Sequence, residues 1–224
     1  MIFRSAFFSR RDGLSEDEFS AHWLKVHGEV ASHMPGVRRY LQNHIRERLF
    51  EVQPFPSHEV GGISQQWFDD IAAMERCEVS PEYAAVKRDI PNFQGAITIL
   101  VLEGTPVIDQ PVTQDAAKLL LVSRLRDPSV ARADVARQQA AAVTEGAGPK
   151  PLRFVQNFVV DKAHPLSANV PSGKVPVDAI SELWFPDRIG LHDWIESKAG
   201  RSVLHGQPAL TPLAAYAVEE IRLV

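Results

Sequence analysis

The alternation of apolar and polar residues in the first half of the chain predicts strand, helix, strand, strand, helix and strand. Residues 2–9 alternate as a strand, and Ser15 with Glu18 three residues later forms a capping box that starts a helix. The apolar positions that follow recur at helical spacing, so one face of this helix packs on a sheet. Further along, the pattern predicts paired strands at 37–49 and 62–68, a second helix at 71–87 and a buried closing strand at 96–102.

The second half of the chain repeats this order of elements. Strands are predicted at 118–124, 153–160, 179–185 and near 216–223, with helices at 129–144 and from Arg188 onward. Two βαββαβ units of the ferredoxin-like type follow, each an α+β unit with two helices on one face of an antiparallel sheet. The uncovered faces need burial, so the two sheets are expected to pack as a sandwich or barrel.

Two sequence strings show that the halves are tandem repeats. YLQN at 40–43 recurs as FVQN at 154–157, and ISQQWF at 63–68 recurs as ISELWF at 180–185. Two blocks in the same order are typical of a duplication. We therefore predict a repeat at 1–104, a second at 117–224 and a linker at 105–116, which contains Pro106 and Pro111.

Composition and charge narrow the classes of partner. The chain has 224 residues, 45% hydrophobic and 23% charged, with a net charge of −4 and a pI near 6.1. It has no basic stripe for nucleic acid, and its longest apolar run, 96–102, is far shorter than a membrane span. The single cysteine, Cys77, cannot form an internal disulfide and fits a small apolar filler. These features favour a cytoplasmic protein.

The duplication allows each scaffold position to be compared with its counterpart. Four polar residues of the first repeat correspond to apolar residues in the second, whereas the scaffold residues are of the same type in both repeats. Because unsatisfied buried polar groups cost free energy, we interpret the first repeat as the working site and the second as a structural copy. The pairs are His27 with Ala141, Tyr40 with Phe154, His44 with Phe158, and Gln66 with Leu183.

The site-bearing residues are expected between helix and sheet. His27 follows Trp23 by four residues on the apolar helix face, so it should point at the sheet, as an acid or base or as a core histidine. Tyr40 and His44 share one strand face, and Gln66 shares a face with Phe68 on the next strand. A hydroxyl and an amide there suit a carbonyl, lactone or phenol, or a buried network without ligand.

The histidines do not predict a metal site. His22, His27 and His33 lie on one predicted helix at spacings of five and six residues, unlike the i, i+4 pair of a zinc helix. A lone histidine could ligate haem, although no sequence feature favours it. We therefore predict neither a metal nor a cofactor.

These residues together resemble an EthD domain. The resemblance rests on GLSEDEF at 13–19, MPGVRRYLQNH at 34–44 and WFDD at 67–70, together with Trp23, His27, Asp89 and Phe93. It implies the dimeric α+β barrel fold, here closed by two copies within one chain. A more distant similarity to methylmuconolactone methylisomerase matches His27 and Tyr40 to its active-site histidine and tyrosine, and Gln66 replaces its cysteine.

The leading hypothesis is a cofactor-independent isomerase or lyase acting on a small apolar cyclic or aromatic compound. His27 is the expected acid or base, and Tyr40 and Gln66 are expected to orient the substrate oxygen. His44, Trp23 and Phe68 are the further substrate-binding candidates. The alternative is a non-catalytic accessory protein that binds a hydrophobic intermediate of a degradation pathway. Free sheet edges would also permit a homodimer.

Overall fold

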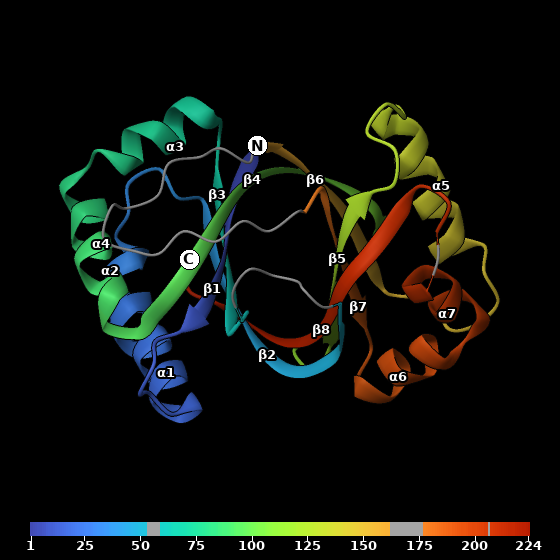
Figure 1. The fold of residues 1–224 in the computed structure, drawn as a ribbon, viewed down its shortest axis with the longest axis horizontal. Helices are drawn as coiled ribbons and strands as arrows, with labels where there is room; N and C mark the ends of the chain where they lie inside the picture. Colours follow the sequence, from blue (N-terminus) through green and yellow to red (C-terminus); the bar gives the residue numbers. More distant parts are fainter. Residues whose placement is uncertain (53–58, 162–176, 206) are drawn as a thin grey trace.

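A single closed antiparallel barrel forms the centre of the protein. The computed structural model describes residues 1–52, 59–161, 177–205 and 207–224. In this part of the chain, eight strands follow one another around the barrel in the order β1-β3-β2-β8-β5-β7-β6-β4 (Figure 1). The strands are β1 (Ile2–Arg10), β2 (Arg39–Glu51), β3 (Gly62–Phe68), β4 (Gln94–Asp109), β5 (Ala117–Leu125), β6 (Arg153–Asp161), β7 (Ala179–Phe185) and β8 (Leu210–Arg222).

Each repeat supplies four consecutive strands of the barrel, which confirms the predicted α+β barrel of ferredoxin-like units. Within the first repeat β4, β1, β3 and β2 lie side by side, and β8, β5, β7 and β6 do so in the second. The repeats join where β2 pairs with β8 and where β4 pairs with β6. Both sheet edges of each repeat are therefore used within the chain. The edges on which we based a homodimer are not free, and dimerisation through another surface stays a prediction.

The strand bounds differ from the prediction mainly at the end of the first repeat. Strands β3 and β7 have the predicted bounds, whereas β4 continues past residue 102 to Asp109. Residues 105–109 of the predicted linker are thus strand, because the long extension of β4 is the part that pairs with β6. Closure of the barrel imposes this extension, and the local sequence, with Gly104 and Pro106, does not signal it.

The helices of each repeat cover the outer face of its own half of the barrel, as the two sides of Figure 1 show. The Ser15–Glu18 capping box is present at the first helix. The single helix predicted at 71–87 is two helices, because Ser80 caps a new helix with Pro81 in its first turn. The elements are α1 (Glu16–His22), the π-helical turn η1 (Trp23–His27), α2 (Gly28–Ser32), α3 (Ile71–Glu78), α4 (Pro81–Phe93), α5 (Arg132–Thr144), α6 (Arg188–Glu196) and α7 (Lys198–His205).

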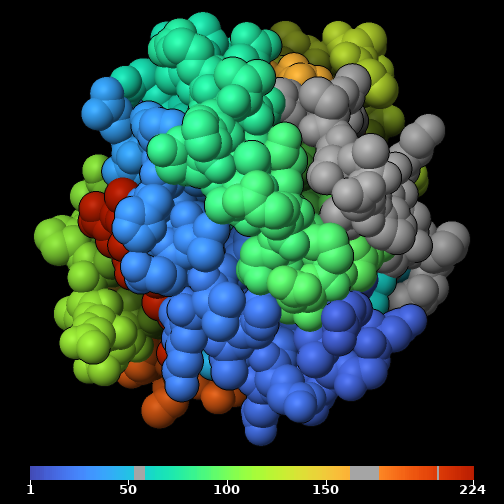
Figure 2. Space-filling view, turned by 90° about the vertical axis from the view of Figure 1, so that its left-hand side faces the viewer, coloured from blue at the N-terminus to red at the C-terminus, as the bar shows by residue number. Residues whose placement is uncertain are grey.

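Figure 2 faces the helices of the first repeat, where the blue α1–α2 segment and the green α4 lie against each other over the sheet. No helix in the described ranges is long and apolar enough to cross a membrane.

The barrel interior combines an apolar core with one buried charge cluster. Lys118 is 1% exposed, and its Nζ lies 2.6 Å from a carboxylate oxygen of Glu182 and 2.5 Å from one of Glu220. Asn43 of the first repeat also accepts a hydrogen bond from this ammonium, at 2.9 Å. A buried charge is tolerated only when it is paired and hydrogen-bonded, so this cluster ties the two repeats together.

The close approach of the first helix to the sheet depends on a glycine, and this gives a test of the fold. A Cβ on Gly62 would lie 2.6 and 2.8 Å from ring atoms of Trp23, whereas a Cβ on Gly190, within α6, would meet only ordinary contacts. We expect Gly62→Ala to lower the free energy of unfolding by about 1–3 kcal/mol. Gly190→Ala is the matched control and should raise it by about 0.5–1 kcal/mol, because alanine favours helix. Urea denaturation measures both. A Gly62→Ala variant as stable as the wild type would contradict this packing.

Candidate functional site

Polar side chains form a row across the sheet of the first repeat, beneath its helices. Arg4 on β1 lies opposite Gln66 on β3, and Gln66 lies opposite Tyr40 on β2. All three are at most 5% exposed. Side chains opposite each other on neighbouring antiparallel strands lie about 5 Å apart at Cβ, so this row is one continuous polar surface.

His27 lies at the end of η1 and is held by a carboxylate from a different helix. Its Nδ1 lies 2.9 Å from Oδ2 of Asp89, which belongs to α4. The other oxygen of Asp89 accepts hydrogen bonds from His22, at 2.9 Å, and from Asn92, at 3.0 Å. The imidazole of His27 also packs on Phe93, with ring centroids 4.6 Å apart. Its Nε2 has no hydrogen-bond partner among the described residues.

The protonation states of this pair follow from burial and contact. Burial lowers the pKa of His27 and outweighs the opposing effect of the Asp89 carboxylate. Burial alone would raise the pKa of Asp89, but hydrogen bonds from His27, Asn92 and His22 bring it well below its usual range. At neutral pH a neutral imidazole therefore donates its Nδ1 proton to an ionised carboxylate. The lone pair on Nε2 is left free to accept a proton.

The hydroxyl of Tyr40 keeps a proton that no described residue accepts. The oxygen of this hydroxyl accepts a hydrogen bond from Nε2 of Gln42, at 3.1 Å, and the Trp23 indole also favours the ionised form of Tyr40. Burial raises the pKa of Tyr40 to about 12, so the group stays protonated at neutral pH. Tyr40 can thus donate a hydrogen bond to a ligand oxygen.

Gln66 also presents free donors. Its Oε1 accepts from the Nε of Arg4 at 3.2 Å and from a terminal amino group of the same guanidinium. Since arginine has no acceptor, this contact fixes the orientation of the amide and leaves the NH₂ group of Gln66 without a partner in the described structure. Glu78 and Tyr83 accept the remaining hydrogen bonds of Arg4, at 3.0 and 2.9 Å. Burial alone would lower the pKa of Arg4, but Tyr83 and Glu78 raise it, so Arg4 is a fixed positive charge.

The charge of Arg4 connects the two parts of the site. It disfavours the charged form of His27 and favours the ionised form of Tyr40, so both groups lie within its electrostatic reach. No hydrogen bond among the described residues joins His27 directly to Tyr40 or Gln66.

The other predicted binding residues have mainly packing and hydrogen-bonding roles. The two imidazole nitrogens of His44 contact Ser20 Oγ and Gln42 Oε1, each at 3.0 Å. Trp23 is fully buried against Phe8 and against the His44 ring, whose centroid lies 4.2 Å from its own. Among the described residues its indole Nε1 has no partner that meets the geometry of a hydrogen bond, although the indole lowers the pKa of Tyr40. Phe68 lies in the apolar cluster that also contains Tyr40.

The structure corrects one of the four comparisons between the repeats. The strand register confirms the counterparts of Tyr40, His44 and Gln66. In the helices, however, buried positions recur as Trp23, His27 and Ala31 in one repeat and as Val135, Gln139 and Val143 in the other. His27 therefore corresponds to the buried, hydrogen-bonded Gln139 and not to Ala141, because the offset between the repeats is 112 residues in this helix and 114 in the strand that follows it. The loss of polar groups in the second repeat is limited to the three strand positions.

Sequence reasoning missed the contacts that Asp89 makes with His27 and that Arg4 makes with Gln66. A signal was present for Asp89, because it lies three residues after Val86 and four before Phe93, on the apolar face of α4. A carboxylate on such a face needs a partner. Arg4 likewise sits among apolar residues of β1, at a position that faces the helices. No group of three or more residues in the described ranges could hold a metal ion.

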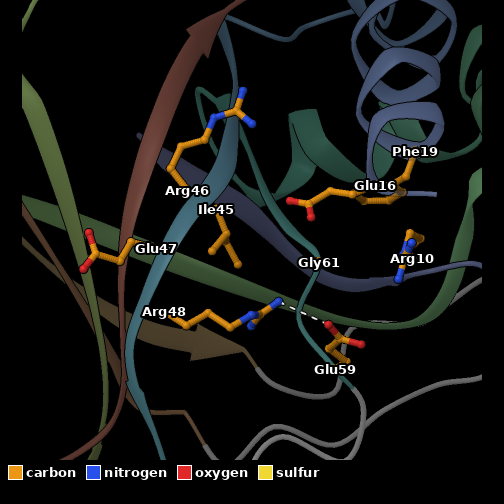
Figure 3. Close-up of a pocket in the computed structure, with 9 residues that line it drawn as sticks. All are labelled: Arg10, Glu16, Phe19, Ile45, Arg46, Glu47, Arg48, Glu59 and Gly61. Carbon is orange, nitrogen blue, oxygen red and sulfur yellow. Dashed lines mark hydrogen bonds and ion pairs between the residues drawn. The ribbon is translucent and has the colours of Figure 1, made fainter.

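A cavity of about 330 Å³ lies next to this layer but is lined by other residues. Figure 3 shows it between β2, which carries Arg46 and Arg48, and the start of α1, which carries Glu16 and Phe19. Arg48 points toward Glu59, and these charged side chains give the cavity a polar wall. None of the predicted site residues lines it.

The comparison with protein families finds a match in the first repeat. Residues 11–95 match the family model of the EthD domain. The first repeat is thus similar to an EthD domain along most of its length. The match spans His27, Tyr40, Gln66 and Asp89, the polar residues that the fold brings between helix and sheet.

The solved structures confirm the barrel fold over the whole chain. A candidate monooxygenase from Lactobacillus acidophilus NCFM has a TM-score of 0.56 and 10% identity, covering 100% of this chain and 94% of its own. An anthrone oxidase-like protein has a TM-score of 0.55 and 8% identity, with coverages of 99% and 92%. An EthD family protein from Bacillus halodurans C-125 has 17% identity and a TM-score of 0.36, and covers 45% of this chain and 95% of its own. No curated protein matches the sequence significantly. Identities this low show the fold alone.

The buried His44 predicts a pH-dependent loss of stability. Burial, helped by the charge of Arg46, lowers the pKa of His44 to about 4 from an ordinary value of 6.5. Between these values the unfolded chain binds a proton that the folded chain does not, so stability falls as the pH falls from 6.5 to 4. We expect this histidine to account for about 2–3 kcal/mol of the loss.

Urea denaturation at pH 7 and pH 4.5 checks this prediction. His44→Gln should show a smaller drop in unfolding free energy than the wild type. His33→Gln, which alters an exposed histidine at the end of α2, should keep the wild-type drop. Equal drops in the wild type and His44→Gln would contradict the assignment.

Proposed function

We propose that the EthD domain of this protein catalyses proton transfer on a small apolar cyclic or aromatic compound that carries a carbonyl or phenol oxygen. The main support for this proposal is that one buried layer contains both a free hydrogen-bond acceptor and free hydrogen-bond donors. Within the described ranges Nε2 of His27 has no hydrogen-bond partner, and neither have the hydroxyl proton of Tyr40 and the amide NH₂ of Gln66. A bound substrate would give each of these groups a partner.

Each residue would have a distinct part in the reaction. His27 takes a proton from a carbon next to the substrate carbonyl, and the electron pair of that C–H bond moves toward the oxygen. Tyr40 and Gln66 donate hydrogen bonds to this oxygen, and the nearby charge of Arg4 stabilises its negative charge. Asp89 holds His27 in the tautomer that keeps Nε2 unprotonated and stabilises the imidazolium once the proton has moved. Return of the proton to another atom gives isomerisation, and loss of a leaving group gives a lyase reaction.

The pKa of His27 suits a base at neutral pH. Because burial lowers this pKa, the imidazole is already neutral at pH 7 and need not lose a proton before it reacts. The reaction rate should therefore start to fall with decreasing pH only below pH 6.5.

Hydrogen–deuterium exchange tests the proposal without knowledge of the product. Compounds from a panel of lactones, phenols and anthrone-like ketones are incubated with the protein in D₂O, and loss of the C–H signal is followed by NMR. His27→Gln should slow exchange by about 10²–10⁴-fold, the usual contribution of a general base. Tyr40→Phe should slow it by removing one donor to the oxygen. Asp89→Asn should lower kcat more than it changes KM, because it disturbs the tautomer and not the binding of substrate.

His33→Gln is the matched histidine control and should leave the exchange rate unchanged. Exchange that persists at the wild-type rate in His27→Gln would refute the proposal.

The alternative is a binding protein that holds an apolar compound without changing it. The apolar cluster that contains Tyr40 and Phe68 supports this alternative. It predicts that panel compounds bind without exchange, and that binding survives His27→Gln but weakens when Trp23 or Phe68 is altered. A further hypothesis is that His27 binds haem. The visible absorption spectrum after addition of haem tests it.

A further inference from the structure

A second cavity, of about 170 Å³, lies at the end of the barrel where β2 and β6 begin. Both repeats line it. Arg39 and Trp67 come from the first repeat, and Arg153 and Trp184 come from the second. The helix-to-sheet layer that contains His27 does not contribute to it, so this cavity is separate from the proposed active site.

The two repeats contribute the same structural unit to this cavity. Arg39 is paired in register with Trp67, and Arg153 is paired in register with Trp184. Each guanidinium stacks over its tryptophan, at 4.6 Å and 5.2 Å from the ring. A guanidinium that stacks on an aromatic face is fixed in orientation, so both positive charges are held at the rim.

These two arginines lack a full set of acceptors. The guanidinium of Arg39 makes no hydrogen bond with the described residues, and its nearest carboxylate oxygen, on Glu220, is 3.7 Å away. Nε of Arg153 lies 3.2 Å from the exposed Asp109, without the geometry of a hydrogen bond. Burial lowers the pKa of Arg39, and the charge of Arg153 lowers it further. An anion between the two guanidiniums would relieve this repulsion and supply the missing acceptors.

A carboxylate already occupies one half of this end of the barrel. Glu220 on β8 lies opposite Asn43, and its carboxylate binds Lys118 and approaches Arg39. The equivalent residue on β4 is Gly104, which lies opposite the equivalent asparagine of the second repeat. Gly104 has no side chain, so the second half has no carboxylate of its own and contains the cavity.

The remaining polar groups of the cavity are compatible with an anion. The Oε2 of Glu182 pairs with Lys118, and its Oε1 accepts from Gln65 and Asn157, so the charge of Glu182 is neutralised within the protein. The Oδ1 of Asn157 accepts no hydrogen bond from the described residues and can receive one from a hydroxyl of the ligand. A Cβ on Gly104 would lie 2.4 Å from this Oδ1, so any side chain there would fill the space.

We propose that this cavity binds a small carboxylate between Arg153 and Arg39, in the place that Glu220 takes in the other half of the barrel. The apolar part of the ligand would lie against Val155 and the edges of the two tryptophans. This is a site for a free carboxylate, distinct from the uncharged ring compounds proposed for the His27 layer.

Isothermal titration calorimetry of the full chain with benzoate tests the proposal. Benzamide, which has the same shape without the charge, is the matched ligand. We expect benzoate to bind with one site per chain and benzamide to bind at least about tenfold more weakly, the difference expected for a charge-assisted contact. Arg153→Gln and Arg39→Gln should each weaken benzoate binding by about tenfold or more. Both side chains are partly exposed, so the variants should fold, as circular dichroism will check.

Two further variants locate the site. Arg46→Gln removes an exposed arginine from the same strand as Arg39, and His27→Gln alters the proposed active site. Both should bind benzoate as the wild type does. No saturable binding of benzoate, equal binding of benzamide, or wild-type binding by both Arg153→Gln and Arg39→Gln would overturn the proposal. Loss of binding in His27→Gln alone would assign the anion to the other site and would also overturn it.

Discussion

The closure of two four-stranded sheets into one barrel is the constraint on which the rest of the structure depends. Each repeat covers one sheet face with its own helices and leaves the other face and two edges unsatisfied. The pairing of β2 with β8 and of β4 with β6 satisfies the edges, and the apolar inner faces fill the barrel. Because the second repeat meets these structural needs, the helix-facing layer of the first repeat is free to carry buried polar groups. In the second repeat, Phe154 and Leu183 occupy the positions of Tyr40 and Gln66.

The polar layer combines groups that are satisfied with groups that are not. Arg4 and Asp89 use their hydrogen-bonding capacity within the protein and are therefore fixed in place. The atoms that they position, Nε2 of His27 and the amide NH₂ of Gln66, have no hydrogen-bond partner in the part of the chain that the structure describes. Fixed supporting groups around free reactive atoms are typical of a preorganised site, in which little reorganisation is needed during the reaction. The π-helical turn at His27 agrees with this interpretation, since such turns are frequent at functional sites.

The sequence was sufficient to predict the fold and part of the site. The repeated strings showed the duplication. The alternation of apolar and polar residues located β3 and β7, because side chains two residues apart in a strand lie on the same face. The strand residues Tyr40, His44 and Gln66 were placed correctly for the same reason. The partner of His27 was not predictable, since Asp89 is 62 residues away and the contact depends on how two helices cross. The predicted counterpart of His27 was also wrong, because the offset between the repeats differs by two residues between this helix and the strands, and no sequence motif anchors the helix.

The most direct test of this account is the protonation state of the His27 imidazole, measured by ¹⁵N NMR at pH 7. The signals are assigned by comparison with His27→Gln. The account predicts a neutral ring that carries its proton on Nδ1, bound to Asp89, and an unprotonated Nε2. A ring protonated on both nitrogens at pH 7, or one with its proton on Nε2, would contradict the proposed base.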